Sequence, residues 1–356
     1  MKNPFYNAKE KRLRSGLRII IQSGVFLFGT ILAGVVLAFV MVAILAAQGK
    51  LNSDLLQDPG SLNAVIMNTS GSLFVLFSQV VSLILIILTM FLAARFLDRR
   101  KFIDFGFHFS KRWFWDLGFG LFLGALLMAL IFLVEYAFGW VEITGYVTTL
   151  SVKTPASTII LYSLVGYICV GIYEEMLFRG YIFRNLAEGL NFKTLGTRGG
   201  LWLAYLISSS IFGIAHLLNP NASLISTVNI ILAGLFLGLG FVLTGELAIP
   251  IGLHITWNFF QGNVFGFPVS GTGSGATVIQ INQLGSDWIT GGVFGPEAGL
   301  IGIIAILIGS LLTILYVKQT RGDLNIQYRL ADYKSTINNN EGTEKSFEEK
   351  QVLASE

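Results

Sequence analysis

Charged residues are scarce in this chain of 356 residues: Asp, Glu, Lys and Arg together make up 13% of it, whereas 53% is hydrophobic. A soluble domain carries about a quarter charged residues, so the composition excludes a soluble globular enzyme and a disordered scaffold. The net charge is only +3, and we expect no nucleic-acid partner. The one cysteine, Cys169, excludes a disulfide framework and a cysteine-based zinc site. The chain is expected to be a membrane protein.

Long apolar runs stand in place of the missing charge. A bilayer core of about 30 Å needs roughly 20 apolar residues in a helix. The runs are continuous rather than alternating, which favours helices over a barrel, and lipid requires backbone groups to be paired within the segment. The predicted fold is an all-α, polytopic membrane bundle of about eight transmembrane helices, at residues 24–47, 71–94, 117–134, 157–178, 200–217, 224–244, 247–265 and 299–317.

The runs and the charges divide the chain into regions. We expect a basic cytoplasmic N-terminus at 1–23, a transmembrane bundle at 24–318 with its core at about 157–265, and a polar, disordered cytoplasmic tail at 319–356. Lys and Arg crowd the N-terminus and the connections after the second, fourth and eighth runs. Such an excess marks cytoplasmic loops, so both termini are predicted to face the cytoplasm. Short loops and the lack of organelle signals are typical of a bacterial cell membrane protein.

The connection at 266–298 is rich in glycine and contains no Lys or Arg. It is longer than most connections between helices, and long ordered loops often have a function. A flexible external connector explains the same composition. The sequence leaves both interpretations open.

Two adjacent carboxylates lie at the end of the fourth apolar run. An ionisable group inside a span costs at least about 2.5–3.5 kcal/mol and suggests a functional site. Neighbouring helical residues point about 100° apart, so Glu174 and Glu175 cannot do the same work. Glu175 is predicted to pair with Arg179, four residues away on the same face. Glu174 has no local partner, and a poorly solvated carboxylate is suited to general acid or base chemistry.

Two of the three histidines also lie in apolar runs. His216 follows Phe212 by four residues, and His254 precedes Asn258 by four, so that His254 and Asn258 share a helical face. A serine nucleophile turn and a His-Glu-x-x-His zinc helix are absent, and Cys169 has no polar neighbours. The remaining chemistry is hydrolysis by a Glu/His/His/Asn set that activates water and holds an oxyanion, with or without Zn²⁺.

The three motifs together resemble a known family. Glu-Glu-x-x-x-Arg, Phe-x-x-x-His and His-x-x-x-Asn, in this order on three apolar runs, are similar to the CAAX protease and bacteriocin-processing (CPBP, Abi) family of intramembrane endopeptidases. This family includes the type II CAAX prenyl endopeptidase. The resemblance covers residues 157–258, and the loop around 266–271 and 295–297 is similar to a bacterial branch. Each motif alone is weak, but the three in order are specific.

The resemblance implies a role for every matched residue. Glu174, helped by His216, would polarise the attacking water; Glu175 and Arg179 would support the site; His254 and Asn258 would stabilise the oxyanion, and Phe212 would shape the pocket. The family is labelled metallo-, and Glu174, His216 and His254 could serve as zinc ligands. A metal-free glutamate mechanism has also been argued for it, so the cofactor stays open. The implied partners are the lipid bilayer and a peptide or membrane-protein substrate.

Two other functions fit part of the pattern. A proton- or cation-coupled transporter could use Glu174, His216 and His254 as a relay, although it does not account for Arg179 or for the pairing of His254 with Asn258. A non-catalytic immunity or scaffold protein would keep the fold without turnover, but no motif residue is missing.

The predicted spans conflict in depth. They place Glu174 and His254 near the cytoplasmic side, and His216 about 24 Å along its helix from Gly200. A single site requires either that the fourth helix continues to about Glu188, or that the fifth span is tilted or shifted.

Overall fold

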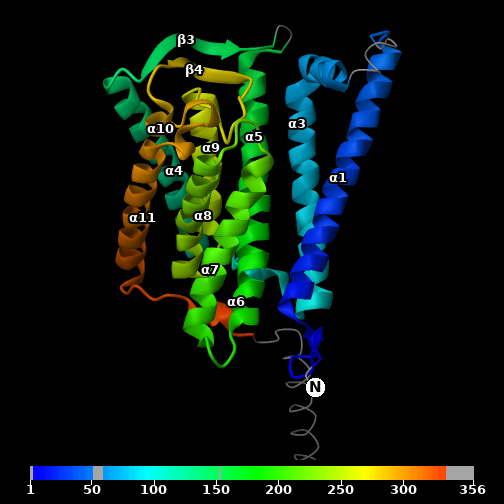
Figure 1. Ribbon diagram of the computed structural model, residues 1–356, viewed down its shortest axis with the longest axis vertical. Coiled ribbons are helices and arrows are strands. Elements are labelled where there is room, and N and C mark those ends of the chain that lie inside the picture. The colour runs from blue at the N-terminus through cyan, green and yellow to red at the C-terminus, as the bar shows by residue number, and fades with distance from the viewer. Residues whose placement is uncertain (1–2, 51–58, 152–153, 334–356) are drawn as a thin grey trace, which may run out of the picture.

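The computed structural model describes residues 3–50, 59–151 and 154–333 (Figure 1). In this part of the chain, seven helices are long and apolar enough to cross a membrane. They are Ser15–Ala47, Gly71–Asp98, Lys111–Ala137, Ala156–Leu190, Gly196–Leu218, Leu224–Thr244 and Leu300–Arg321. The predicted class, a helical multi-pass membrane bundle, is confirmed.

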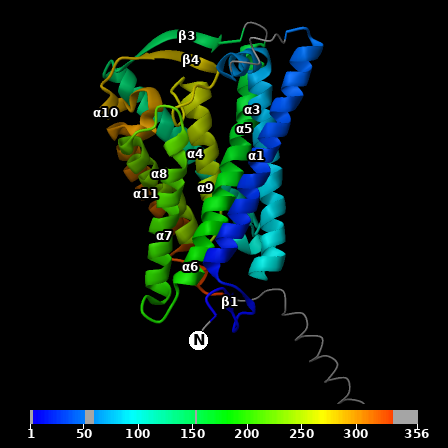
Figure 2. The ribbon, with the colours of Figure 1, turned by 45° about the vertical axis from the view of Figure 1, so that its right-hand side comes forward.

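The elements have the following bounds. The helices are α1 (Ser15–Ala47), α3 (Pro59–Leu92), α4 (Lys111–Ala137), α5 (Ala156–Glu175), α6 (Arg184–Leu190), α7 (Gly196–Ala215), α8 (Leu224–Thr244), α9 (Ala248–Phe259), α10 (Asp287–Thr290) and α11 (Leu300–Arg321). The strands are β1 (Tyr6–Asn7), β2 (Arg12–Leu13), β3 (Val141–Thr149) and β4 (Ala276–Gln283). The helices α1 and α3 pack beside each other, and α3 packs against α5 (Figures 1 and 2).

The helix that carries Glu174 is longer than predicted. After α5 the chain passes through a π-helical segment, Met176–Phe183, directly into α6, so that one helix runs from Ala156 to Leu190. Short π-helical segments occur frequently at functional sites. Glu174 therefore lies about 24 Å from the Leu190 end. This is the first of the two solutions to the conflict in depth, because the long helix places Glu174 near the middle of the bundle.

The seventh expected span, 247–265, is a shorter central helix. It consists of α9 and a π-helical segment, Phe260–Val264, and α9 is buried throughout Ala248–Ile255. Glycines allow α4 to approach it closely: a Cβ at Gly120 would collide with the backbone of α9, as would one at Gly124. A helix enclosed by other helices does not need the length of one that faces lipid across the whole bilayer.

Charged side chains fix the N-terminal segment to the base of the bundle. Glu188, in α6, pairs with Arg12, Arg18 and Arg100, and Arg18 also pairs with Asp98. All of these side chains are buried. Breaking a buried ion pair by removing one partner typically costs about 3–5 kcal/mol. The basic N-terminus is thus partly folded into the protein, and α1 begins at Ser15 rather than at 24.

The C-terminal region is ordered further than predicted. After α11, residues 322–333 return across the same end of the bundle, where Leu330 and Ala331 are buried. The Arg12 guanidinium lies 3.2 Å from the centre of the Tyr333 ring, a cation–π contact. The rest of the predicted tail, 334–356, lies outside the described residues.

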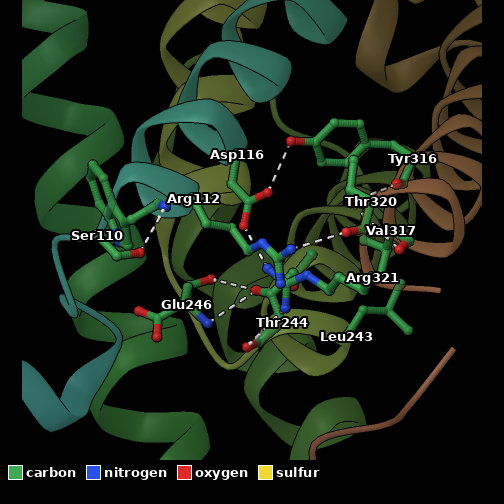
Figure 3. Close-up of polar contacts among 12 residues, drawn as sticks. Ser110, Arg112, Asp116, Leu243, Thr244, Glu246, Tyr316, Val317, Thr320 and Arg321 are labelled. Carbon is green, nitrogen blue, oxygen red and sulfur yellow. Dashed lines mark hydrogen bonds and ion pairs between the residues drawn. The ribbon is translucent and has the colours of Figure 1, made fainter. Parts of the chain in front are cut away.

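A second polar cluster joins α4 to α11 at this end (Figure 3). Asp116 accepts hydrogen bonds from the Tyr316 hydroxyl at 3.0 Å and from Nη2 of Arg321 at 2.6 Å. Nη1 of Arg321 also points to the carbonyl oxygen of Thr244, at the end of α8. Three helices are therefore tied together where they leave the apolar part of the bundle.

The opposite end is covered by a two-stranded antiparallel sheet that the sequence did not predict. β3 pairs with β4, with Val141 opposite Gln283 and Thr149 opposite Ala276. Figure 1 shows this sheet above α5 and α9. The connection at 266–298 supplies β4 and α10, so it is an ordered part of the fold rather than a flexible connector.

Candidate active site

A cavity of about 230 Å³ lies among α5, α7, α8 and α9. Its lining includes five residues that the sequence motifs singled out: Glu174, Phe212, His216, His254 and Asn258. They come from three helices that are separate along the chain. The structure thus brings the three motifs to one place.

Glu175 and Arg179 lie behind this cavity. Nη1 of Arg179 donates to Oε1 of Glu175 at 2.9 Å, so the predicted ion pair is present. The same Oε1 lies 2.9 Å from Nδ1 of His254. A carboxylate paired with arginine only accepts hydrogen bonds, so Nδ1 of His254 carries a hydrogen. This leaves Nε2 as the ring nitrogen free to act in the cavity.

Arg179 also fixes the neighbouring helices. Its Nη2 donates to the carbonyl oxygen of Gly234 in α8 at 2.9 Å, and its guanidinium lies 4.3 Å from the centre of the Phe212 ring. That ring packs in turn against His216 and, edge to face, against His254. Phe212 is buried and forms part of the cavity wall. The aromatic ring thus keeps the two histidines at fixed positions.

Glu174 is the carboxylate that faces the cavity. Its Oε2 is buried and has no hydrogen-bond partner within the described residues. Nε2 of His254 lies 3.8 Å from this oxygen, which is too long for a direct hydrogen bond. An unpaired buried carboxylate oxygen is costly to the fold, and functional sites are where such costs are found.

The tautomer of His216 follows from its one hydrogen bond. Nδ1 lies 2.8 Å from the carbonyl oxygen of Phe212. A carbonyl oxygen can only accept, so Nδ1 is the donor, and in the neutral ring Nε2 presents a lone pair. His216 is half-buried on the cavity wall, so this lone pair is the one that can act as an acceptor there.

The cavity has a further wall that the motifs did not predict. The strap, residues 266–275, contributes Val269, Ser270 and Thr272, and Glu297 lies beside them. Gln79 reaches the cavity from α3. No periodicity or local spacing marks these residues, because they meet the site only through the tertiary fold.

Glu297 is fixed under the strap. Its Oε1 accepts hydrogen bonds from the backbone N–H of Ser270 at 2.6 Å and from the Ser270 hydroxyl at 3.2 Å, and Oε2 accepts from the side-chain amide of Gln261. Burial raises the pKa of Glu297 to about 7, although the hydrogen bonds from Ser270 and Gln261 act to lower it. Glu297 is thus a second carboxylate beside the cavity.

Glu174, His216 and His254 are also the expected zinc ligands. Among the described residues, no group of three or more His, Cys, Asp and Glu side chains is spaced to hold a metal ion. Each histidine donates its Nδ1–H, His254 to Glu175 and His216 to the carbonyl oxygen of Phe212, and keeps Nε2 available. A catalytic zinc site has three protein ligands and an open position, and the assignment of Glu174, His216 and His254 to such a site stays a prediction.

The core of the chain is similar to a known protease family. Residues 156–260 match the family model described as type II CAAX prenyl endopeptidase Rce1-like. The resemblance predicted from the motifs is confirmed over this segment, which contains all three of them. Neither the curated proteins nor the solved structures include a significant match to the chain.

Proposed function

From the family match and the cavity together, we propose that this protein is an intramembrane endopeptidase. Its substrate would be a membrane-associated peptide or protein, whose peptide bond is hydrolysed by an activated water. The observation that carries the proposal is the convergence of Glu174, His216, His254 and Asn258 on one cavity. A proton relay has no need of Asn258, because an amide side chain does not titrate.

Water activation is assigned to Glu174 and His216. Oε2 of Glu174 and Nε2 of His216 are both acceptors that border the cavity. A water between them can donate one hydrogen to each, which leaves its oxygen lone pair directed at a substrate carbonyl. As the water attacks, Glu174 takes its proton, and it later gives this proton to the leaving amine.

Oxyanion stabilisation is assigned to His254 and Asn258. Both lie on one face of α9 and line the cavity. The ring of His254 and the side-chain amide of Asn258 can stabilise the oxygen on which negative charge develops. Glu175 is a positioning residue here, because its carboxylate orients the ring of His254 through Nδ1.

The proposal includes a metal-free reaction. Its support is that, in the described part of the chain, no group of three or more His, Cys, Asp and Glu side chains is spaced to hold a metal ion. No step of the reaction above passes through a zinc ion. We expect cleavage to persist after dialysis against a chelator such as EDTA, and metal analysis of the active protein to find less than about one zinc per chain. Loss of activity that zinc restores would contradict this part of the proposal.

The proposal also assigns the protein to a bacterial cell membrane, with both termini in the cytoplasm. The described segments before α1 and after α11 lie at one end of the bundle, with the loops after α3 and α6 (Figures 1 and 2). Cytoplasmic loops carry an excess of Lys and Arg. After Cys169→Ala, a thiol reagent that does not cross membranes should label Ser286→Cys on intact cells and leave Lys9→Cys unlabelled. The reverse pattern would invert the orientation.

The enzyme assay uses the full chain in detergent micelles or liposomes. A panel of apolar peptides is incubated with wild type, with Glu174→Gln and with Glu142→Gln, in which an exposed glutamate of β3 is changed. Mass spectrometry should detect defined fragments with wild type and Glu142→Gln and not with Glu174→Gln. Fragments that appear equally with Glu174→Gln would contradict the proposed function.

A further inference from the structure

The charges that border the cavity are of one sign. Two carboxylates, Glu174 and Glu297, line it, and no Lys or Arg is present in its lining among the described residues. The nearby guanidinium of Arg179 lies behind the wall and is already paired with Glu175. A substrate group that enters this space therefore meets negative charge, which attracts a cation and opposes a further carboxylate.

Glu297 retains capacity to bind one more donor. Oε1 accepts from the backbone N–H and the hydroxyl of Ser270, and Oε2 accepts from the side-chain amide of Gln261. Each carboxylate oxygen has about two acceptor positions, so Oε2 can accept a further hydrogen bond. The side chain is 3% exposed, and contact with a cation in so poorly solvated a place is stronger than in water.

The cavity wall formed by the strap and Glu297 comes from a different part of the sequence than the proposed catalytic residues. Glu297 and the strap lie outside the segment 156–260 that matches the protease family. The strap is nevertheless fixed to that segment: Nδ2 of Asn219 donates to the carbonyl oxygen of Ser270 at 3.0 Å, and Nδ2 of Asn221 donates to that of Gly271 at 3.2 Å. An element of this kind can select substrates while the matched segment performs the chemistry.

We propose that Glu297 recognises a basic residue, Lys or Arg, that lies close to the scissile bond of the substrate. This inference rests on the proposed endopeptidase function and names the substrate class for that site. The cation would donate to Oε2 of Glu297 and replace water around the buried carboxylate. A substrate with an acidic residue, or with its own terminal carboxylate, at this position is disfavoured.

The burial of Glu297 supports this role. Burial raises its pKa to about 7, so an ionised Glu297 lacks enough solvation and gains from a cationic partner. A purely structural tether would need no charge, because glutamine could accept the same hydrogen bonds from Ser270. The charge of Glu297 and its hydrogen bond to the strap can therefore be separated experimentally.

The test compares matched peptides with the full chain in detergent at about pH 8. The apolar peptides within one set are identical except at one position, which carries Lys, Gln or Glu. From one set to the next, this position moves along the peptide. Initial cleavage rates are measured by mass spectrometry. For wild type we expect one position at which Lys exceeds Glu by about tenfold or more, with Gln between them.

Three variants assign the preference. Glu297→Gln should reduce the Lys-to-Glu ratio to about one, because the charge is lost. Glu142→Gln, which removes an exposed carboxylate of β3, should keep the wild-type ratio. Ser270→Ala removes one hydrogen bond to Oε1 but keeps the charge, and it should also keep the preference.

Several results would overturn the inference. The first is that wild type cuts the Glu peptides as fast as the Lys peptides at every position. This result is obtained with wild type alone, so it does not depend on whether any variant folds. A second is that the preference for Lys over Glu persists in Glu297→Gln. A third is that Ser270→Ala abolishes this preference as completely as Glu297→Gln does. In each case cleavage that is absent in Glu174→Gln leaves the proposed function standing. If wild type and Glu174→Gln cut no peptide, the proposed function and this inference both fail.

Discussion

Oε1 of Glu175 accepts a hydrogen bond from Nδ1 of His254 at 2.9 Å, and this contact joins α5 to α9 across 79 positions of sequence. The same oxygen accepts from Arg179. A single buried carboxylate thus neutralises an arginine and orients a histidine. Glu174, the next residue along the helix, faces the cavity instead.

The two glutamates should respond differently to the same substitution. Glu174→Gln keeps the size of the side chain but cannot take a proton, so turnover should fall by about 10²–10⁴-fold. The thermal unfolding temperature in detergent should change little. An enzyme that keeps near-normal turnover after Glu174→Gln would require another general base.

Glu175→Gln should lower both stability and turnover. It removes the charge that neutralises Arg179, and leaving a buried charge unpaired typically costs about 3–5 kcal/mol. It also allows the ring of His254 to turn. Expression, unfolding temperature and cleavage rate should fall together, whereas Glu142→Gln should change none of them. A well-folded, fully active Glu175→Gln would show that the contact with His254 is dispensable.

Asn258→Ala should affect the chemical step. Removing one oxyanion donor typically lowers kcat by about 10²–10³-fold, with a much smaller change in KM. The matched control is Asn282→Ala, at an exposed position of β4. If KM rises while kcat is kept, Asn258 binds substrate rather than the oxyanion.

Gly124→Ala should displace α9 from α4. A Cβ at Gly124 would collide with Oγ1 of Thr256 and with the backbone of Leu253. Overpacking of this kind typically costs about 1–3 kcal/mol, and the shift moves His254 out of place. Gly118→Ala, six residues earlier on the same helix, meets nothing within 4 Å and should be neutral. Equal unfolding temperatures for the two variants would contradict the close contact.

The pH dependence of stability should report on Glu297. Its pKa is raised to about 7 from 4.5, so the folded protein holds this proton more tightly than the unfolded chain does. The resulting stabilisation is complete below about pH 4.5 and is lost as the pH rises through about 7. The unfolding temperature of wild type should fall over this interval more than that of Glu297→Gln. Parallel curves for the two proteins would be evidence against a buried, protonatable Glu297.

The sequence predicted what depends on short spacing. The fold class followed from the apolar runs, and the Glu175–Arg179 pair followed from a separation of four on one helix. The contact between Glu175 and His254 could not be predicted in this way, because it depends on how α5 and α9 pack. Gln79 and Glu297 reach the cavity from distant elements for the same reason.

The boundaries that were wrong have physical causes. Arg18 belongs to α1 because its charge is paired inside the protein, whereas apolar content alone places it before the membrane. The π-helical segment Met176–Phe183 keeps the chain helical beyond the apolar run and carries Glu174 to the middle of the bundle. β3 and β4 form one sheet only because the chain between them returns to the same end.

The short central helix has a consequence for how the protein is made. α9 with its π-helical segment runs from Ala248 to Val264, at the short end of the lengths that can cross a bilayer. It packs against α4, α5 and α8, all of which precede it in the chain. During synthesis the motif residues of α5 and α7 are therefore made before those of α9, and the candidate site is incomplete until α9 has been added. A nascent chain that stops before Ala248 lacks His254 and Asn258, so we expect it to be inactive.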